Sequence, residues 1–197
     1  MIDFLKHYHI ILGSQSPRRK ELLRGMDIDF EVLIQNTKED YPETLPTTEV
    51  PEYLACKKAT AYNFSQLPEN TLLITSDTIV LLNDEILGKP QDEEDARKIL
   101  SKLSGNMHTV LSGVCLKTNK KQHSFTATSH VFFRQLEDIE IDHYVTHYKP
   151  LDKAGAYGIQ EWIGYIGIER IEGSYFNVMG LPTQKLFVEM KKFLEKI

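Results

Sequence analysis

Strand-like and helix-like hydrophobic patterns alternate along this chain and predict a mixed α/β fold. Continuous or alternating apolar residues predict strands at 10–12, 30–34, 71–82, 86–87, 108–117 and 122–134, and at least one strand in the glycine-rich stretch 154–173. Apolar residues spaced three and four apart predict helices at 17–25, from 51 to about 64, at 92–105, at 141–148 and from about 182 onward. Because the second of two successive long strands alternates like an antiparallel one, a mixed β-sheet with flanking helices is favoured over a parallel sheet.

The first predicted helix opens on an unusual pair of cations. Ser16 suits the N-cap and Pro17 the first helical position. Arg18 and Arg19 follow in the first turn, where the helix dipole disfavours each positive charge by roughly 0.3–1 kcal/mol. The segment predicts a site for a polyanion. It brings together backbone N–H groups, the hydroxyls of Ser14 and Ser16, and two guanidinium groups. The alternative is that both arginines point into solvent.

The composition is ordinary for a globular protein, so specific chemistry must come from local clusters. With 197 residues, 41% of them hydrophobic and 26% charged, residues 1–197 are expected to form a single domain or two tightly joined lobes. A net charge of −5 gives no reason to expect nucleic acid or a membrane as a partner. Cys56 and Cys115 lack the spacing of metal ligands and are expected to be buried, reduced thiols, which suits a cytoplasmic protein. The same location is expected because the chain shows no signal-peptide pattern and no apolar run of membrane-spanning length.

Two charged residues interrupt patterns that call for apolar side chains. Asp77 lies inside the predicted strand 71–82, and a carboxylate in a buried strand is costly unless it is paired, protonated or bound to a metal. Apolar residues on both sides favour a continuous strand with a functional carboxylate over a strand that ends at a capping aspartate. Lys58 falls in the middle of the apolar face of the second helix. Its side chain either extends to solvent along its stem or crosses the core side to reach an anion.

Three further residues are unremarkable alone and informative together. Lys89 follows the strand 86–87, and the next residue, Pro90, restricts the turn that carries it. Glu39 lies in the polar stretch after the strand 30–34. Gln160 ends a segment of small residues, which lets the backbone come close to other segments or to a ligand. Cations, carboxylates and an amide in this combination suit a nucleotide-phosphate hydrolase that uses a divalent metal. The chain lacks the Gly-x-x-x-x-Gly-Lys-Ser/Thr motif of P-loop kinases and shows no Gly-x-Gly-x-x-Gly dinucleotide motif after a strand.

Six segments, in order, closely resemble the Maf-like nucleotide pyrophosphatases, which are also called septum-formation inhibitor proteins. These segments, spread over nearly the whole chain, are 14–19, 55–59, 76–78, 88–90, 153–160 and 173–182. The resemblance implies a cytoplasmic α/β protein of the Maf-like or inosine triphosphatase-like architecture, with two lobes around a central cleft and usually a homodimer. The implied reaction is hydrolysis of a nucleoside triphosphate to the monophosphate and pyrophosphate.

The resemblance also implies individual roles. Asp77 matches the proton acceptor, and Glu39 with Asp77 matches the acids that bind a divalent cation, Mg²⁺ or Mn²⁺, with the adjacent Asp40 as the alternative to Glu39. The residues that match the phosphate-binding positions are Ser14, Arg18, Arg19, Lys58 and Lys89. The residues that match the base-choice positions of the branch acting on dTTP and UTP are Arg18, Thr78 and Gln160. A glutamine amide carries a donor beside an acceptor, as does the edge of uracil or thymine.

Two other functions stay open at this point. One is a non-catalytic regulator of cell division that binds a nucleotide or a protein partner, and the presence of both acids disfavours it. The other is an inosine-type purine triphosphate pyrophosphatase, which requires a purine-sized base pocket. Pyrophosphate release from a panel of nucleotides, with and without a chelator, discriminates among the three functions.

Overall fold

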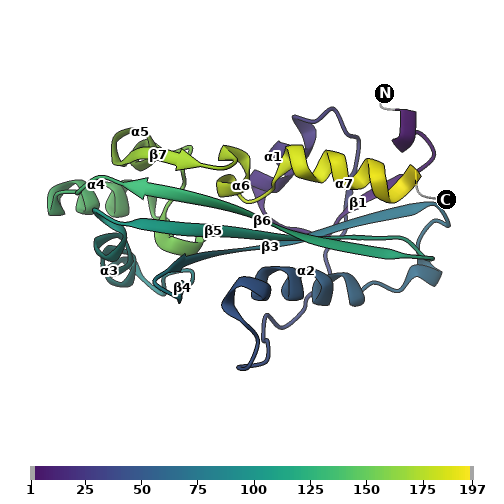
Figure 1. Ribbon diagram of the computed structural model, residues 1–197, viewed down its shortest axis with the longest axis horizontal. Helices are drawn as coiled ribbons and strands as arrows, with labels where there is room; N and C mark the ends of the chain where they lie inside the picture. The colour runs from purple at the N-terminus through teal and green to yellow at the C-terminus, as the bar shows by residue number, and fades with distance from the viewer. Residues whose placement is uncertain (1–2, 196–197) are drawn as a thin grey trace. The chain divides into compact units, whose positions relative to one another are not determined.

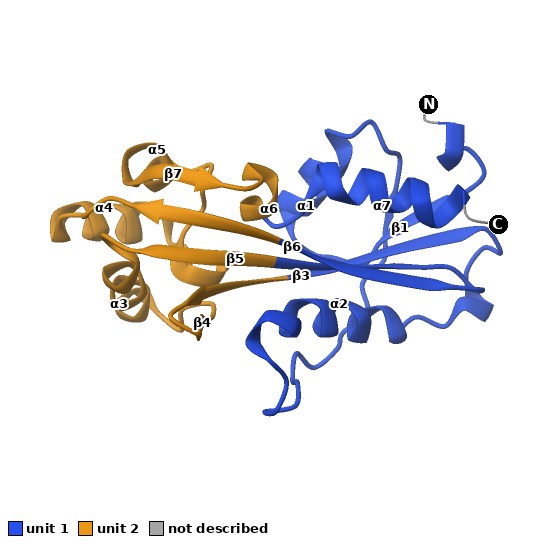
Figure 2. Cartoon of the chain, viewed as in Figure 1, with its two compact units in different colours: residues 1–77, 112–127, 180–197 blue, residues 78–111, 128–179 orange. Residues whose placement is uncertain are grey.

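The computed structural model describes residues 3–195, which divide into two compact units (Figure 2). Unit 1 comprises residues 1–77, 112–127 and 180–197, and unit 2 comprises residues 78–111 and 128–179.

One mixed β-sheet runs through the described residues. Its strands are β1 (His9–Leu12), β2 (Glu31–Val32), β3 (Thr71–Leu82), β4 (Glu85–Leu87), β5 (Met107–Lys117), β6 (Gln122–Phe133) and β7 (Ile168–Glu172). Their order in the sheet is β2-β1-β3-β5-β6-β7, and β4 pairs with β3. Strand β1 is parallel to β2 and β3, whereas the pairs β3–β4 and β6–β7 are antiparallel. The predicted mixed sheet is therefore confirmed.

Helices flank this sheet in both units. The α-helices are α1 (Pro17–Arg24), α2 (Val50–Thr60), α3 (Glu93–Leu103), α4 (Asp138–Tyr148), α5 (Trp162–Gly167), α6 (Tyr175–Met179) and α7 (Thr183–Glu195). Four short 3₁₀ helices join them within the described chain: η1 (Asp3–Leu5), η2 (Thr47–Glu49), η3 (Phe64–Gln66) and η4 (Ala154–Ala156).

Most elements match the sequence pattern, and the differences have local causes. Strand β3 has its predicted bounds, and the hairpin to β4 turns through Asn83 and Asp84, both with positive φ. The predicted strand 30–34 is reduced to β2, which pairs with only the last two residues of β1. Helix α2 ends at Thr60 rather than near residue 64, because the Asn63 side chain accepts the Ser65 N–H and starts η3. The short helices α5 and α6 were not predicted, since each spans too few residues to show a periodic pattern.

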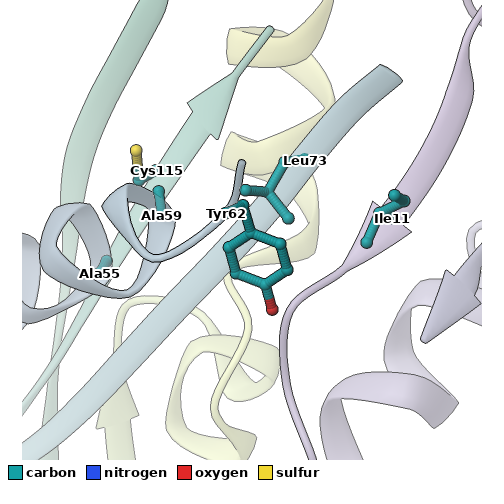
Figure 3. Packing of buried hydrophobic residues seen from close by; sticks show 6 residues of the cluster. All are labelled: Ile11, Ala55, Ala59, Tyr62, Leu73 and Cys115. Atoms are coloured by element: carbon teal, nitrogen blue, oxygen red, sulfur yellow. The ribbon is translucent and has the colours of Figure 1, made fainter. Parts of the chain in front are cut away.

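In unit 1, α2 covers one face of the sheet, and α1 and α7 cover the other (Figure 1). Small side chains of α2, Ala55 and Ala59, are fully buried and let the helix lie close to the strands. They pack in one cluster with Ile11, Leu73 and Cys115 (Figure 3). This cluster fixes the position of α2, and with it the side chains that α2 directs toward β3.

Unit 2 has its own core, in which α3 packs against α4 and η4. His108 and Tyr157 are buried side by side, with the Nε2 of His108 2.7 Å from the Tyr157 hydroxyl. Gly155 has φ +71°, and a Cβ there would lie 3.0 Å from Val80, so this glycine serves tight packing. Among the described residues, none of the helices has the length and apolar character needed to cross a membrane.

Candidate active site

The side chain of Asp77 faces α2 from the middle of β3. Alternation along the strand puts Thr75 and Asp77 on the same face, and the Thr75 hydroxyl donates to the Ala55 carbonyl of α2 at 2.7 Å. One helical turn further on, the ammonium of Lys58 donates to Oδ1 of Asp77 at 2.5 Å. Asp77 is 8% exposed, and β3 continues through it without a break. The sequence prediction of a carboxylate inside a continuous buried strand is confirmed.

The same ammonium also binds a carboxylate from the polar stretch after β2. Lys58 Nζ lies 2.7 Å from Oε1 of Glu39, and the Lys58 side chain is 17% exposed. The neighbouring acid takes a different partner, since Asp40 pairs with Lys57 at 2.6 Å with 73% of its side chain exposed. Glu39 rather than Asp40 therefore joins Asp77. We call Lys58, Asp77 and Glu39 the carboxylate–lysine cluster.

Arg19 turns inward from the first turn of α1 and joins distant parts of unit 1. Its Nε donates to the Gly180 carbonyl at 2.8 Å, and its Nη1 donates to the Ser76 carbonyl at 2.8 Å and to the Ser14 hydroxyl at 3.3 Å. Burial lowers the pKa of the Arg19 guanidinium, while the charge of Asp77 opposes that shift. The alternative in which both arginines point into solvent is wrong for Arg19.

The loop between β1 and α1 is ordered by local side-chain contacts. Ser16 caps α1 by accepting the Arg19 N–H, as its sequence position predicts. The Ser14 hydroxyl is buried and also accepts the Ser16 N–H at 3.3 Å. Arg18 is partly exposed next to Arg19 on the same turn. The polar groups expected to form an anion site thus gather around the N-terminus of α1, and several of them already bind protein atoms.

Three of the candidate residues belong to unit 2. Thr78 follows Asp77 on β3 and is partly buried on the opposite face of the strand. Lys89 is exposed in the loop after β4 and has no ion-pair partner among residues 3–195. Gln160 is partly buried, and its side-chain oxygen Oε1 is fully buried without a hydrogen-bond donor in the described part of the chain. A buried acceptor without a donor destabilises the protein, and a ligand that brings a hydrogen-bond donor would satisfy it.

The loop that carries Gln160 is held by a buried polar network. The Tyr144 hydroxyl donates to a carboxylate oxygen of Glu161 and accepts the Gly158 N–H at 3.0 Å. Lys153 pairs with the other oxygen of Glu161 at 3.2 Å. Bonds on both sides of Gln160 restrict where its amide can point.

Glu39 and Asp77 are the residues of the carboxylate–lysine cluster that could bind a divalent cation. Two carboxylates from separate segments approach one positive charge, and Mg²⁺ is commonly held by one or two carboxylates together with substrate phosphates. Across the described residues, no group of three or more His, Cys, Asp and Glu side chains could hold a metal by itself. The residues therefore fit a metal that is bound jointly with substrate, and they do not fit an all-protein metal cage.

Some participants in this site are backbone groups, which sequence reasoning missed. The carbonyls of Ser76 and Gly180 accept the Arg19 guanidinium and tie α1 to β3 and to the segment before α7. The sequence offers no signal for the Gly180 contact beyond the glycine itself, whose φ is +117°. Thr75 is also missed by the sequence reasoning, because its anchoring of α2 depends on the tertiary contact with Ala55.

Fold and site together define a mixed α/β protein whose long strand β3 presents a carboxylate to a lysine of the covering helix, beside an arginine-bearing helix N-terminus. The family model described as Maf-like protein matches residues 9–193. The chain belongs to the Maf-like family, as the sequence resemblance indicated.

Several curated relatives are similar over nearly their entire length. A protein of Phocaeicola vulgatus named dTTP/UTP pyrophosphatase is 55% identical over 193 residues, which cover 98% of this chain and 100% of the relative. A protein of Porphyromonas gingivalis with the same name is 53% identical over 197 residues and 99% of both chains. Among solved structures, the Staphylococcus aureus Ham1 protein matches with a TM-score of 0.46 and 14% identity, over 64% of this chain and 71% of that one. That likeness is too low to bear on the fold.

Proposed function

We propose that this chain is a nucleoside triphosphate pyrophosphatase that hydrolyses dTTP and UTP to the monophosphate and pyrophosphate. Its Maf-like relatives carry the name dTTP/UTP pyrophosphatase at 50–55% identity over most of the chain. The structural observation that carries the proposal is the meeting of Asp77 and Glu39 on the Lys58 ammonium. This arrangement supports hydrolysis rather than binding alone, because a carboxylate held in one orientation is suited to activate a water molecule.

Asp77 is the proposed proton acceptor. Lys58 binds Oδ1, which fixes the carboxylate plane and leaves Oδ2 to orient a water molecule and take its proton. The water oxygen attacks the α-phosphorus, the bond from the α-phosphorus to the bridging oxygen breaks, and pyrophosphate leaves. A positioned general base of this kind contributes roughly 10²–10⁴-fold in rate.

Cationic side chains stabilise the charge that develops on pyrophosphate. We assign direct phosphate contacts to Arg18, which is partly exposed, and to Lys89, which is exposed. The Nε and Nη1 of Arg19 already donate to backbone carbonyls. Its proposed role is to hold Ser14 and the N-terminus of α1 in place beside β3. Charge stabilisation by fixed groups needs no reorganisation during the reaction, which makes such groups effective.

Glu39 and Asp77 are the residues proposed to hold Mg²⁺ or Mn²⁺ together with the substrate phosphates. A bound divalent cation supplies charge neutralisation on the phosphates and orientation of the reacting groups. Lys58 then serves to keep the two carboxylates near each other despite their like charges.

Base choice is assigned to Gln160, with Thr78 and Arg18 as further contributors. The buried Oε1 of Gln160 lacks a donor among residues 3–195, and the N–H of uracil or thymine would provide one while a carbonyl of the base accepts from the amide nitrogen. We also propose a cytoplasmic location and a homodimer, both of which rest on the sequence resemblance.

Pyrophosphate release from a nucleotide panel tests the proposed function. Purified protein is incubated with dTTP, UTP, CTP, ATP, GTP and ITP in the presence of Mg²⁺ or Mn²⁺, and products are separated by ion-exchange chromatography. We expect the monophosphate and pyrophosphate from dTTP and UTP, and loss of turnover with excess chelator. Release of single phosphate, full activity in chelator, or a preference for ITP would each contradict the proposal.

A further inference from the structure

Helix α2 and strand β5 approach each other closely in unit 1. A Cβ added to Gly113 of β5 would lie 2.2 Å from the carbonyl carbon of Pro51 and 2.3 Å from the backbone nitrogen of Glu52. The helix backbone therefore rests directly on the strand, which only a glycine permits at this point. The close approach brings short side chains of the two elements into contact.

The register of this contact places the two cysteines opposite each other. Residues 113 and 115 point to the same face of β5, and two residues along a strand advance by about 6.7 Å. Four residues along a helix, from Glu52 to Cys56, advance by about 6 Å. Cys115 thus faces the turn that carries Cys56, as its packing against Ala55 and Ala59 shows (Figure 3).

Cys56 packs against the cluster that contains Cys115, but the two thiols have different surroundings. Cys115 is fully buried, whereas Cys56 is partly exposed, so the expectation of two buried thiols is wrong for Cys56. A hydrogen bond from the Cys115 thiol lowers the pKa of Cys56, and the Ser124 hydroxyl acts in the same direction. The bond to Cys56 and burial raise the pKa of Cys115. Cys56 is therefore the member of the pair that an oxidant can reach, and Cys115 is the buried member beside it.

We propose that Cys56 and Cys115 form a redox-active pair that reacts with hydroperoxides and closes to a reversible intramolecular disulfide. An accessible cysteine next to a second, resolving cysteine is the arrangement typical of redox-sensing sites. This site is separate from the carboxylate–lysine cluster, although Cys56 shares α2 with Lys58.

The reaction balances with hydrogen peroxide as the oxidant. The Cys56 sulfur attacks one peroxide oxygen, the O–O bond breaks, and the departing hydroxide takes up the thiol proton as water. The resulting Cys56 sulfenic acid is attacked by the Cys115 sulfur, the S–S bond forms, and the hydroxyl leaves with the Cys115 proton as a second water. The two thiols together lose two electrons, and a small dithiol or glutathione returns them on reduction.

Mass spectrometry of the full-length folded protein tests this proposal. The reduced protein is treated with a small excess of hydrogen peroxide, denatured, alkylated, digested and mapped. We expect a cross-linked peptide pair that contains Cys56 and Cys115, loss of both alkylation sites, and recovery of both after dithiothreitol. Because the chain has only two cysteines, no other intramolecular pairing competes.

Single-cysteine variants assign the order of the steps. Cys115→Ser should accumulate a sulfenic acid on Cys56 that dimedone traps, whereas the matched variant Cys56→Ser should leave Cys115 unmodified at the same peroxide concentration. Both thiols still alkylatable after peroxide, or a disulfide only between two chains, would overturn the proposal. The wild-type mapping decides the question even if a variant folds poorly.

Discussion

The ammonium of Lys58 lies 2.5 Å from Oδ1 of Asp77, so the carboxylate in the middle of β3 has its counter-ion on the covering helix α2. This pairing explains how a nearly buried carboxylate is tolerated in a strand of apolar residues, since an unpaired charge there would be costly. It also holds the proposed proton acceptor in one orientation. The pair thus connects the stability of unit 1 with the proposed chemistry.

Asp77→Asn tests the role of the carboxylate. The amide keeps the size of the side chain and can still accept from Lys58, which remains paired with Glu39, but it cannot take a proton from water. We expect kcat to fall by roughly 10²–10⁴-fold, with the urea denaturation midpoint changed little. Near-normal kcat in a folded variant would place water activation at another residue.

Lys58→Met should lower both activity and stability, because it leaves the mostly buried Asp77 carboxylate without its donor. The expected loss in the free energy of unfolding is about 1–3 kcal/mol. Lys57→Met is the matched control, since Lys57 pairs with the largely exposed Asp40, and its effect should stay within about 0.5 kcal/mol.

A double-mutant cycle isolates the pair itself. The Lys58→Met, Asp77→Asn double variant should be less destabilised than the sum of the single variants, because the neutral amide no longer requires a counter-ion. Equal, mild effects of Lys57→Met and Lys58→Met in urea denaturation and turnover would remove Lys58 from the site.

Gln160→Ala should reduce the preference for UTP over CTP more than it reduces overall turnover. The buried Oε1 of Gln160 suits the uracil N–H, and cytosine presents no such donor, so groups would remain unpaired at a cost of about 1–3 kcal/mol. The measurement is the ratio of kcat/KM for UTP to kcat/KM for CTP. The contact should raise this ratio about ten- to a hundredfold in the wild type. An unchanged ratio in the variant would assign base recognition to other residues.

The buried His108 makes stability depend on pH. Burial lowers the pKa of His108 to about 3, whereas histidine in an unfolded chain titrates near pH 6.5. Below about pH 6.5 the unfolded chain therefore takes up a proton that the folded protein does not, so the free energy of unfolding decreases as the pH falls. The expected slope is about 1.4 kcal/mol per pH unit once the unfolded histidine is fully protonated, and the contribution vanishes above its unfolded pKa.

Urea denaturation between pH 5 and pH 7 checks this slope. His108→Gln should remove most of the histidine contribution, while His147→Gln, at an exposed position, should keep the wild-type slope. A wild-type slope retained in His108→Gln would assign the pH dependence to other groups.

Local patterns determined much of this protein from sequence alone. The bounds of β3, the capping of α1 by Ser16 and the position of Asp77 inside a continuous strand follow from residues next to each other in the chain. Such features depend on backbone geometry and on burial that alternates with a short period, so neighbouring residues suffice to predict them.

Tertiary structure decided which partner each polar side chain takes. Lys58 crosses to Asp77 rather than extending to solvent, Glu39 joins it while Asp40 pairs at the surface, and Arg19 turns back to bind backbone carbonyls. The contact of Cys56 with Cys115 likewise depends on how closely α2 rests on β5. These outcomes could not be predicted from periodicity, because a long side chain can reach several partners and packing between distant segments selects one of them.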